Sequence, residues 1–314
     1  MWKLDPLQVT LAVVLDSVAG DPPGWPHVTR ATGWLASRFE RSLTRCVGRT
    51  VGSGLAFWLA VCGTVLASFG LLRRLLGRVH PAAAWAADVL AVYQALAAAD
   101  LVRHIRAVLA PLRAGNLAVA RVRLAMVVGR DTHNLDRREI SRAAIETLAE
   151  SSNDAFVAPL FWAVVAGPGG ALLYRIANTL DSIVGHRDER YEAFGKVSAR
   201  ADDALNWLPA RLCAAVSESR HRFRNWGEIR REAVQHASPN AGWSESAAAW
   251  AMGVRLGGVN FYDGIPLAGP VFHPAGREPG PEEIASGINW FRQVALVASA
   301  ALIVTSALRY LSRV

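Results

Sequence analysis

An uninterrupted apolar run constrains this chain more than any other feature. The 22 residues from Val51 to Leu72 carry no charged side chain. At 1.5 Å per residue, a helix of that length crosses the roughly 30 Å hydrocarbon core of a bilayer. The whole chain has 314 residues, of which 52% are hydrophobic and only 19% are charged, an unusual balance for a soluble protein. We therefore expect an integral membrane protein.

A second spanning helix is predicted near the carboxyl end. Val294 to Leu308 is uncharged, and Trp290 and Tyr310 flank this run where interfacial aromatic residues sit on a spanning helix. Because this run is shorter than the first, the prediction of a spanning helix here depends partly on the flanking aromatic residues.

Two further apolar segments are interrupted. Ala82 to Val102 contains Asp88 and Asp100, which favours burial against protein rather than lipid. Ala155 to Tyr174 is broken at Gly167–Pro168–Gly169–Gly170, a pattern expected of a broken span or a re-entrant pair of short helices. The sequence thus predicts an all-α polytopic membrane protein, a single domain over residues 1–314 with about four or five spanning or re-entrant helices.

The charge pattern indicates which side of the membrane the loops face. Residues 103–142 contain nine arginines against three acidic residues, which favours a cytoplasmic location under the positive-inside rule. The net charge is +8, yet no nucleic-acid-binding motif appears, so a nucleic-acid partner is not expected. The three cysteines lie far apart and predict neither disulfides nor a zinc site. We expect polar loops that meet at the cytoplasmic face of the cell membrane.

A dense polar run, residues 178–211, directly follows an apolar stretch. Such groups are costly beside lipid unless they have a function. If the preceding helix continues past Ile183, Asn178, Asp181 and Ser182 fall at positions i, i+3 and i+4 and share one face. This arrangement predicts a first polar stripe.

A second polar stripe follows if the chain returns to helix from about Ser198. Asp202 and Asn206 are then four residues apart, Asp203 lies beside them, and Pro209 is expected to limit the helix. Carboxylates, amides and cations together suit a metal-bound phosphate. The cations between the two stripes are Arg187, Arg190, Lys196 and Arg200.

An acidic helix is predicted upstream, over Glu139 to Asp154. Glu146, Glu150 and Asp154 recur every four residues on the side opposite its apolar face. Like charges at this spacing oppose helix formation. A bound cation would remove the penalty. The alternative is an exposed acidic face neutralised by arginines, and the direct entry of this helix into the apolar run from Phe156 to Ala166 weakens that alternative.

Two turn-rich motifs follow toward the carboxyl end. SPNAGW begins at Ser238 and precedes an alanine-rich helix for which Ser244 is a natural N-cap. The amino end of a helix favours an anionic ligand. Residues 256–264, LGGVNFYDG, are expected to form a turn-rich loop, for which an ordinary turn is the simpler interpretation and closure over a substrate the alternative.

Nine segments carry a family resemblance when they are taken together and in order. They are GDP at Gly20, GRDT at Gly129, ETLAESSND at Glu146, APLF at Ala158, NTLDS at Asn178, RYEAFG at Arg190, ARADDALNWLPARL at Ala199, SPNAGW at Ser238 and LGGVNFYDG at Leu256. Together they resemble the CobD/CbiB family, the adenosylcobinamide-phosphate synthases of cobalamin biosynthesis. The chain departs from the family pattern at Pro26–His27 and at Ser151.

The resemblance implies a membrane-embedded amide synthase. Such an enzyme joins adenosylcobyric acid, through a corrin propionate, to (R)-1-amino-2-propanol or its O-phosphate, with ATP and Mg²⁺. The partners it implies are these substrates, membrane lipid, and either a second copy of the chain or other late membrane enzymes of the pathway. How ATP is held is left open, because no Walker A loop is present.

The candidate site residues fall into three sets. The catalytic candidates are Glu146, Glu150, Asp154, Asp181 and Asp203. The candidate Mg²⁺ ligands are Glu150, Asp181, Asp202 and Asp203. The substrate and phosphate contacts are Asn178, Ser182, Arg190, Lys196, Arg200, Asn206, Arg211, Ser238 and Asn240. We expect the two acidic groups, residues 146–154 and 178–211, to form one composite site.

Two other readings compete with this one. A UbiA-type prenyltransferase also uses Asp-rich motifs near helix ends, but after Asn178–x–x–Asp181 the next aspartate, Asp188, comes seven residues on rather than four. A non-catalytic membrane sensor such as the related AmpE proteins would be expected to lack the paired acidic motifs, which are intact here.

Overall fold

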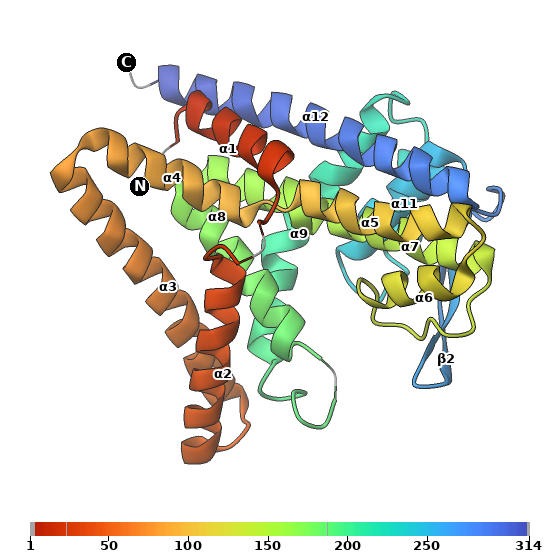
Figure 1. The fold of residues 1–314 in the computed structure, drawn as a ribbon, viewed down its shortest axis with the longest axis horizontal. Helices are drawn as coiled ribbons and strands as arrows, with labels where there is room; N and C mark the ends of the chain where they lie inside the picture. The colour runs from red at the N-terminus through yellow and green to blue at the C-terminus, as the bar shows by residue number, and fades with distance from the viewer. Residues whose placement is uncertain (1–3, 23, 187, 313–314) are drawn as a thin grey trace. The chain divides into compact units, whose positions relative to one another are not determined.

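A computed structural model describes residues 4–22, 24–186 and 188–312, and Figure 1 shows that helices dominate the fold. The chain divides into two compact units, each built from separate stretches of sequence. The first unit comprises the residues up to Ala97, Ala158–Asn206 and the residues from Ser299 on. The second comprises Ala98–Val157 and Trp207–Ala298. The single domain expected over residues 1–314 stays a prediction.

The first unit contains α1 (Pro6–Ala19), α2 (Val28–Val47), α3 (Val51–Val79), α4 (Pro81–Ala95), α8 (Ala158–Val184), the start of α9 (Lys196–Ser219) and the end of α12 (Pro281–Leu311). Local chemistry fixes several of these helix starts. The side chain of Asp5 caps α1 and that of Thr50 caps α3, each in a reciprocal pair with the residue three positions on. The side chain of His27 caps α2.

The core of the first unit lies between α2, α3 and α8. Its buried side chains include Phe57, Val61, Leu172, Ile176, Leu180 and Phe194. At Gly54 of α3 an added Cβ would collide with the backbone carbonyl of Phe194, so a glycine is required for this close approach. The charged residue predicted inside the next apolar segment, Asp88 of α4, is buried and pairs with Arg73 of α3 at 2.6 Å. A charge in an apolar segment is thus paired inside the protein.

The helix that carries the first polar stripe is kinked where the sequence predicted a break. Gly167 has a φ of 74°, outside the helical range, and Pro168 follows it. Beyond the kink the helix continues to Val184, as expected for the face that carries Asn178. The expected stop at Pro209 is wrong, because α9 runs through this proline to Ser219. Pro209 is buried, and Ala210 and Ala214 just after it pack in the core of the second unit, so tertiary contacts override the local penalty.

The second unit contains α5 (Ala98–Arg113), α6 (Leu117–Ala125), α7 (Arg137–Ser152), the π-helical turn η1 (Asn153–Val157), the rest of α9, α10 (Trp226–Ala233), α11 (Ala241–Met252), β1 (Leu256–Tyr262), β2 (Ile265–Phe272) and the start of α12. Helix α7 begins at a capping box between Asp136 and Glu139, as its acidic first turn favours.

The LGGVNFYDG segment, expected as a loop, instead forms the first strand of an antiparallel hairpin. β1 pairs with β2 from Leu256 opposite Phe272 to Tyr262 opposite Ile265, with a bulge between Gly257 and Val259. The turn residues Asp263 and Gly264 both have positive φ, which suits a tight hairpin turn. The turn signal was therefore correct, but the flanking strands were missed, because neither one shows the alternation of buried and exposed residues that predicts a strand.

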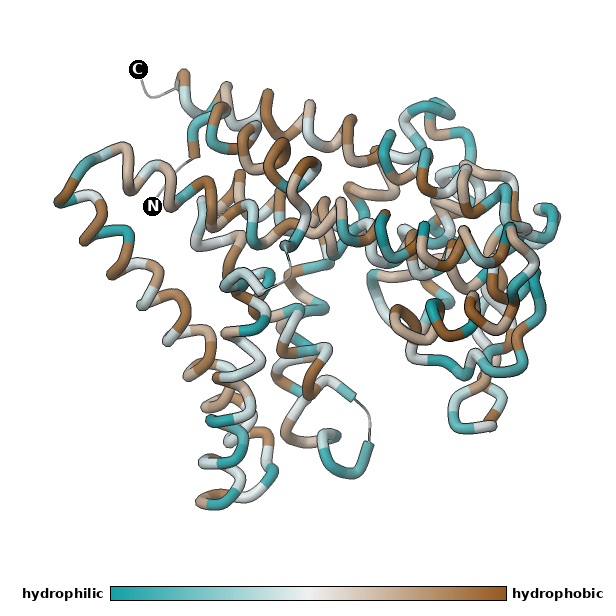
Figure 2. Tube along the Cα trace, in the orientation of Figure 1, coloured by the Kyte–Doolittle hydropathy of each residue, from teal (hydrophilic) through white to brown (hydrophobic). Residues whose placement is uncertain are grey.

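Within the part of the chain that the structure describes, four helical stretches are long and apolar enough to cross a membrane: Val51–Val79, Pro81–Arg113, Arg137–Val184 and Pro281–Leu311. Figure 2 shows hydrophobic residues along most of α3. The all-α polytopic class expected from the sequence is confirmed.

Candidate functional site

Two amide side chains hold the carboxylate of Asp202 in the first unit. Asn178 of α8 donates from Nδ2 to Oδ1 of Asp202 at 3.3 Å, and Asn206, one turn along α9, donates from Nδ2 to its Oδ2 at 2.9 Å. The buried Asn206 in turn accepts a 2.8 Å hydrogen bond from the hydroxyl of Tyr174. The two polar stripes predicted from the sequence therefore meet at Asp202.

Sequence reasoning missed two contributors to this network, Tyr174 and Arg175. Arg175 is 8% exposed, donates from Nε to the carbonyl of Ala95 at 2.8 Å, and approaches Oδ1 of Asn178 at 3.4 Å. The sequence carried a signal for Arg175, because an arginine inside an apolar run is energetically costly unless it is paired within the protein. Tyr174 lies one helical turn before Asn178 and shares its face.

Other predicted residues of the first unit lie along α8 and α9. Ser182 donates from Oγ to the carbonyl of Asn178 at 3.0 Å, and Asp181 lies one turn after Asn178. On α9, Asp203 is half-buried, whereas Lys196 and Arg200 are exposed. These two cations are therefore accessible to an anionic ligand.

Arg190 has a structural partner. Its guanidinium pairs with Glu40 of α2 at 2.8 Å and lies over the ring of Tyr191 at 4.9 Å. Arg49 also pairs with this carboxylate, at 3.0 Å. Burial alone would raise the pKa of Glu40, but hydrogen bonds and charge from the two arginines hold it below its usual value. The neighbouring prediction, Arg187, lies outside the described residues.

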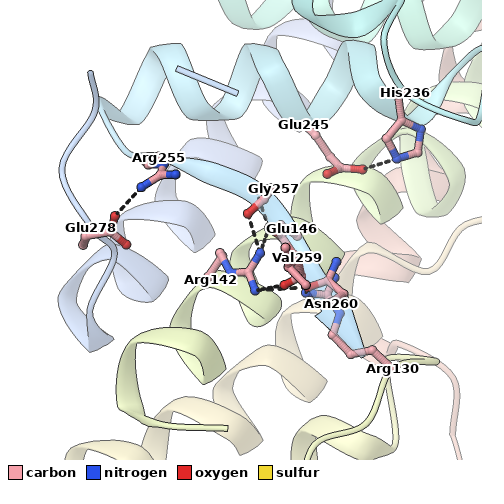
Figure 3. A network of polar contacts seen from close by, with 10 residues as sticks. All are labelled: Arg130, Arg142, Glu146, His236, Glu245, Arg255, Gly257, Val259, Asn260 and Glu278. Carbon is pink, nitrogen blue, oxygen red and sulfur yellow. Dashed lines mark hydrogen bonds and ion pairs between the residues drawn. The ribbon is translucent and has the colours of Figure 1, made fainter. Parts of the chain in front are cut away.

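In the second unit, Glu146 of α7 is the centre of a buried ionic network (Figure 3). Arg130 pairs with its Oε2 at 2.6 Å, and Arg142 lies 3.5 Å from its Oε1. The backbone N–H of Gly257 in β1 donates to the same Oε1 at 2.7 Å. Arg142 extends the network by donating to the carbonyls of Gly257 and Val259. Glu146 therefore binds the hairpin to α7.

The GRDT motif docks on the same hairpin. Arg130 donates to Oδ1 of Asn260 at 2.8 Å, while the N–H of Asp131 donates to the carbonyl of Phe261 at 2.8 Å. The carboxylate of Asp131 accepts from the N–H of Gly264 at the hairpin turn, at 2.7 Å. Hydrogen bonds therefore join the GRDT motif to the LGGVNFYDG segment, which lies far from it in the sequence.

A further acidic residue, Glu245 of α11, belongs to the charged surroundings of Glu146 and Glu150. It is 7% exposed, and its Oε1 lies 3.7 Å from Nε2 of His236. Burial raises the pKa of Glu245 well above its usual value, and the charges of Glu150 and Glu146 add to this effect. Burial lowers the pKa of His236. Glu150 is exposed at the surface of α7, and Asp154 is half-buried in η1.

Arg211, in the part of α9 that belongs to the second unit, is sandwiched between aromatic rings. Its guanidinium lies 4.2 Å from the ring centre of Trp207 and 4.9 Å from that of Trp243, and it approaches Oδ1 of Asn240 at 3.4 Å. Such stacking favours the planar cation. The predicted phosphate contact is therefore partly occupied by protein groups.

The SPNAGW turn is closed by its own first residue. Oγ of Ser238 accepts hydrogen bonds from the N–H groups of Asn240 and Ala241, both at 3.2 Å. Helix α11 begins at Ala241 with Asn240 at its N-cap position, so the expected cap at Ser244 is wrong. Ser244 lies within the first turn and donates to the carbonyl of Ala241, because the helix starts earlier than the apolar pattern indicates.

Within residues 4–22, 24–186 and 188–312, no three His, Cys, Asp or Glu side chains form a ready-made metal cage. This donor set nevertheless fits Mg²⁺, which commonly takes one or two carboxylates and completes its shell with water and substrate phosphates. Asp181 and Asp202 would supply such oxygens. The expected closeness of the acidic groups 146–154 and 178–211 stays a prediction, because they belong to different units.

The helices define a polytopic α-helical membrane protein whose acidic side chains are held by amides and arginines. The model of the CobD/Cbib protein family matches residues 9–291. The cobalamin biosynthesis protein CobD of Klebsiella pneumoniae is 39% identical over 96% of both chains. CbiB of Salmonella typhimurium is 37% identical, covering 93% of this chain and 95% of its own. The chain belongs to the CobD/CbiB family. No solved structure matches it.

Proposed function

We propose that this protein is a cobalamin-biosynthesis enzyme that forms an amide between a corrin propionate and an amino alcohol. The substrates would be adenosylcobyric acid and (R)-1-amino-2-propanol or its O-phosphate, with ATP as the energy source. Its place in cobalamin biosynthesis is supported by family membership, since the curated relatives carry the name cobalamin biosynthesis protein. The active site would face the cytoplasm, where these substrates are made.

The chemistry explains why a site of this composition is needed. A carboxylate is a poor acceptor for an amine, so its oxygen first attacks the γ-phosphorus of ATP and ADP leaves. The amine nitrogen then attacks the acyl carbon, the C–O bond to phosphate breaks, and inorganic phosphate departs while a base takes the ammonium proton. Bound Mg²⁺ would neutralise charge on the transferring phosphoryl group.

One observation carries the proposal for the first unit: Asp202 is positioned by Asn178 and Asn206 from two helices. Two amide donors keep this carboxylate oriented, and Asp181 lies one turn from Asn178. Asp181, Asp202 and Asp203 would hold Mg²⁺, while Lys196 and Arg200 bind phosphate oxygens. Glu146, Glu150 and Asp154 of the second unit stay predicted catalytic residues.

The test is reconstitution of the reaction. The purified protein is incubated in detergent with adenosylcobyric acid, ATP, Mg²⁺ and each amine in turn, and the product is identified by mass. We expect amide with at least one amine and loss of turnover by about a hundredfold in Asp202→Asn, in line with removal of an essential charged group. Glu278→Gln, at an exposed ion pair, is the matched control. If neither amine gives product while a related enzyme is active, the AmpE-like sensor reading is favoured.

A further inference from the structure

The loop that connects α9 to α10 gathers positive charge on the surface of the second unit. Arg220, His221, Arg222, Arg224 and Asn225 line one open hollow of about 400 Å³. Apart from the asparagine, every side chain that lines it can carry a positive charge. We call residues 220–225 the basic loop. The positive charge of the hollow that it lines fits an anionic ligand.

The protein does not neutralise this charge itself. Within the described residues, Arg220, Arg222 and Arg224 have no ion-pair partner. The preceding acid, Glu218, is 1% exposed and accepts an inward hydrogen bond from Asn225 at 3.1 Å. Positive charge is therefore left on the surface for an external partner.

The backbone of the basic loop presents an aromatic residue among these cations. Arg222 and Phe223 both have left-handed φ values, 54° and 58°. The N–H of Phe223 is nevertheless held by the carbonyl of Glu218 at 3.2 Å. The phenyl ring is 50% exposed and makes a T-shaped contact with Trp226, with 5.9 Å between ring centres. An exposed aromatic ring among arginines is typical of a membrane interface.

A hydrogen bond joins the end of α9, just before the basic loop, to the spanning helix α12. Trp290 of α12 donates from Nε1 to Oγ of Ser217 at 2.8 Å. Trp290 lies four residues before the uncharged run that begins at Val294. The basic loop begins three residues after Ser217, about 4.5 Å along a helix. Apart from the length of the two side chains, the basic loop therefore starts within about two helical turns of the end of that uncharged run.

We propose that the basic loop is a binding surface for anionic phospholipid headgroups. Arginine binds phosphate oxygens in a bidentate fashion, and each arginine near an anionic leaflet adds to membrane attraction. Phe223 would enter the interface between the headgroups. The function is independent of the amide synthesis and concerns how the second unit is held at the membrane.

The test uses the full-length protein in nanodiscs, followed by hydrogen–deuterium exchange of the peptides that cover residues 219–226. We expect slower exchange in discs containing phosphatidylglycerol than in discs of phosphatidylcholine alone. The triple variant R220Q/R222Q/R224Q should lose this difference. In a detergent titration it should also lose roughly a hundredfold in affinity for phosphatidylglycerol, as expected for three arginines at an anionic surface.

The matched control is R123Q/R137Q/R138Q, which removes the same charge from exposed positions of the same unit. It should keep the lipid-dependent protection. Equal exchange in the two kinds of disc would overturn the proposal. Protection in phosphatidylcholine discs on addition of inorganic phosphate or ATP, without any effect of phosphatidylglycerol, would also overturn it and assign the basic loop to a soluble phosphate.

Discussion

Glu146 and Gly257 lie 111 residues apart in the chain, yet the N–H of Gly257 donates a 2.7 Å hydrogen bond to the carboxylate of Glu146. Position 257 requires glycine for two reasons. Its φ is +79°, and a Cβ there would collide with the carbonyl of Pro270. The bulge in the hairpin turns this N–H toward α7. One glycine therefore connects two of the motifs by which the family is recognised.

Removing the carboxylate of Glu146 should strongly destabilise the second unit. Glu146→Ala leaves Arg130 and Arg142, both mostly buried, without their counter-charge, and a broken buried pair costs about 3–5 kcal/mol. Glu146→Gln should cost less, since its amide oxygen still accepts from Gly257. The measurement is the free energy of unfolding in mixed micelles. Equal losses for the two variants would contradict this account, and Glu278→Gln should change stability by about 0–1 kcal/mol.

Gly54→Ala should destabilise the first unit. The new methyl group would collide with the carbonyl of Phe194, and overpacking of this kind costs about 1–3 kcal/mol. Gly63→Ala in the same helix meets nothing within 4 Å and should be neutral or stabilising, because alanine is the better helix former. Thermal unfolding of both variants in the same detergent decides the matter. Similar midpoints for the two would show that α3 does not approach Phe194 this closely.

Acid should weaken the contact between α2 and the 185–195 segment through Glu40. Its pKa is lowered in the folded protein, so its stabilising effect is complete above the unfolded value near 4.5 and is lost as the pH falls through the folded value. Glu40→Gln should lower the thermal midpoint at neutral pH. It should also make the decrease of that midpoint at acid pH, the acid limb of the profile, less steep. An unchanged acid limb in this variant would assign the acid sensitivity to other carboxylates.

Glu245 should give the opposite pH dependence. Its pKa is raised by burial, so above about pH 4.5 the unfolded chain releases a proton that the folded protein keeps. Stability therefore falls as the pH rises from 4.5 toward the folded pKa. Glu245→Gln should remove this decline and stabilise the protein at neutral pH. The check is the thermal midpoint as a function of pH, with the exposed Glu189→Gln as the control; parallel profiles for wild type and Glu245→Gln would refute it.

Much of the candidate site was predictable because its residues recur at helical spacing. Asn178 with Asp181, and Asp202 with Asn206, lie on the faces that the i, i+3 and i+4 pattern assigns to them. Tyr174 and Arg175 were missed because they sit inside an apolar run, where composition outweighs single polar residues. Arg190 was predicted as a phosphate contact, but a carboxylate 150 residues away occupies it. No local pattern identifies such a partner.

The sequence by itself determined the membrane class, the helix faces that carry the polar stripes, and the family, because apolar run length, helical periodicity and ordered motifs are properties of consecutive residues. Only the tertiary structure decided which polar groups satisfy one another: Asp202 with two amides, Glu146 with two arginines and a backbone N–H, and Glu40 with Arg190. Those pairings join residues distant in the chain. They form because a polar group removed from water must find its partner wherever the packed helices bring one within reach.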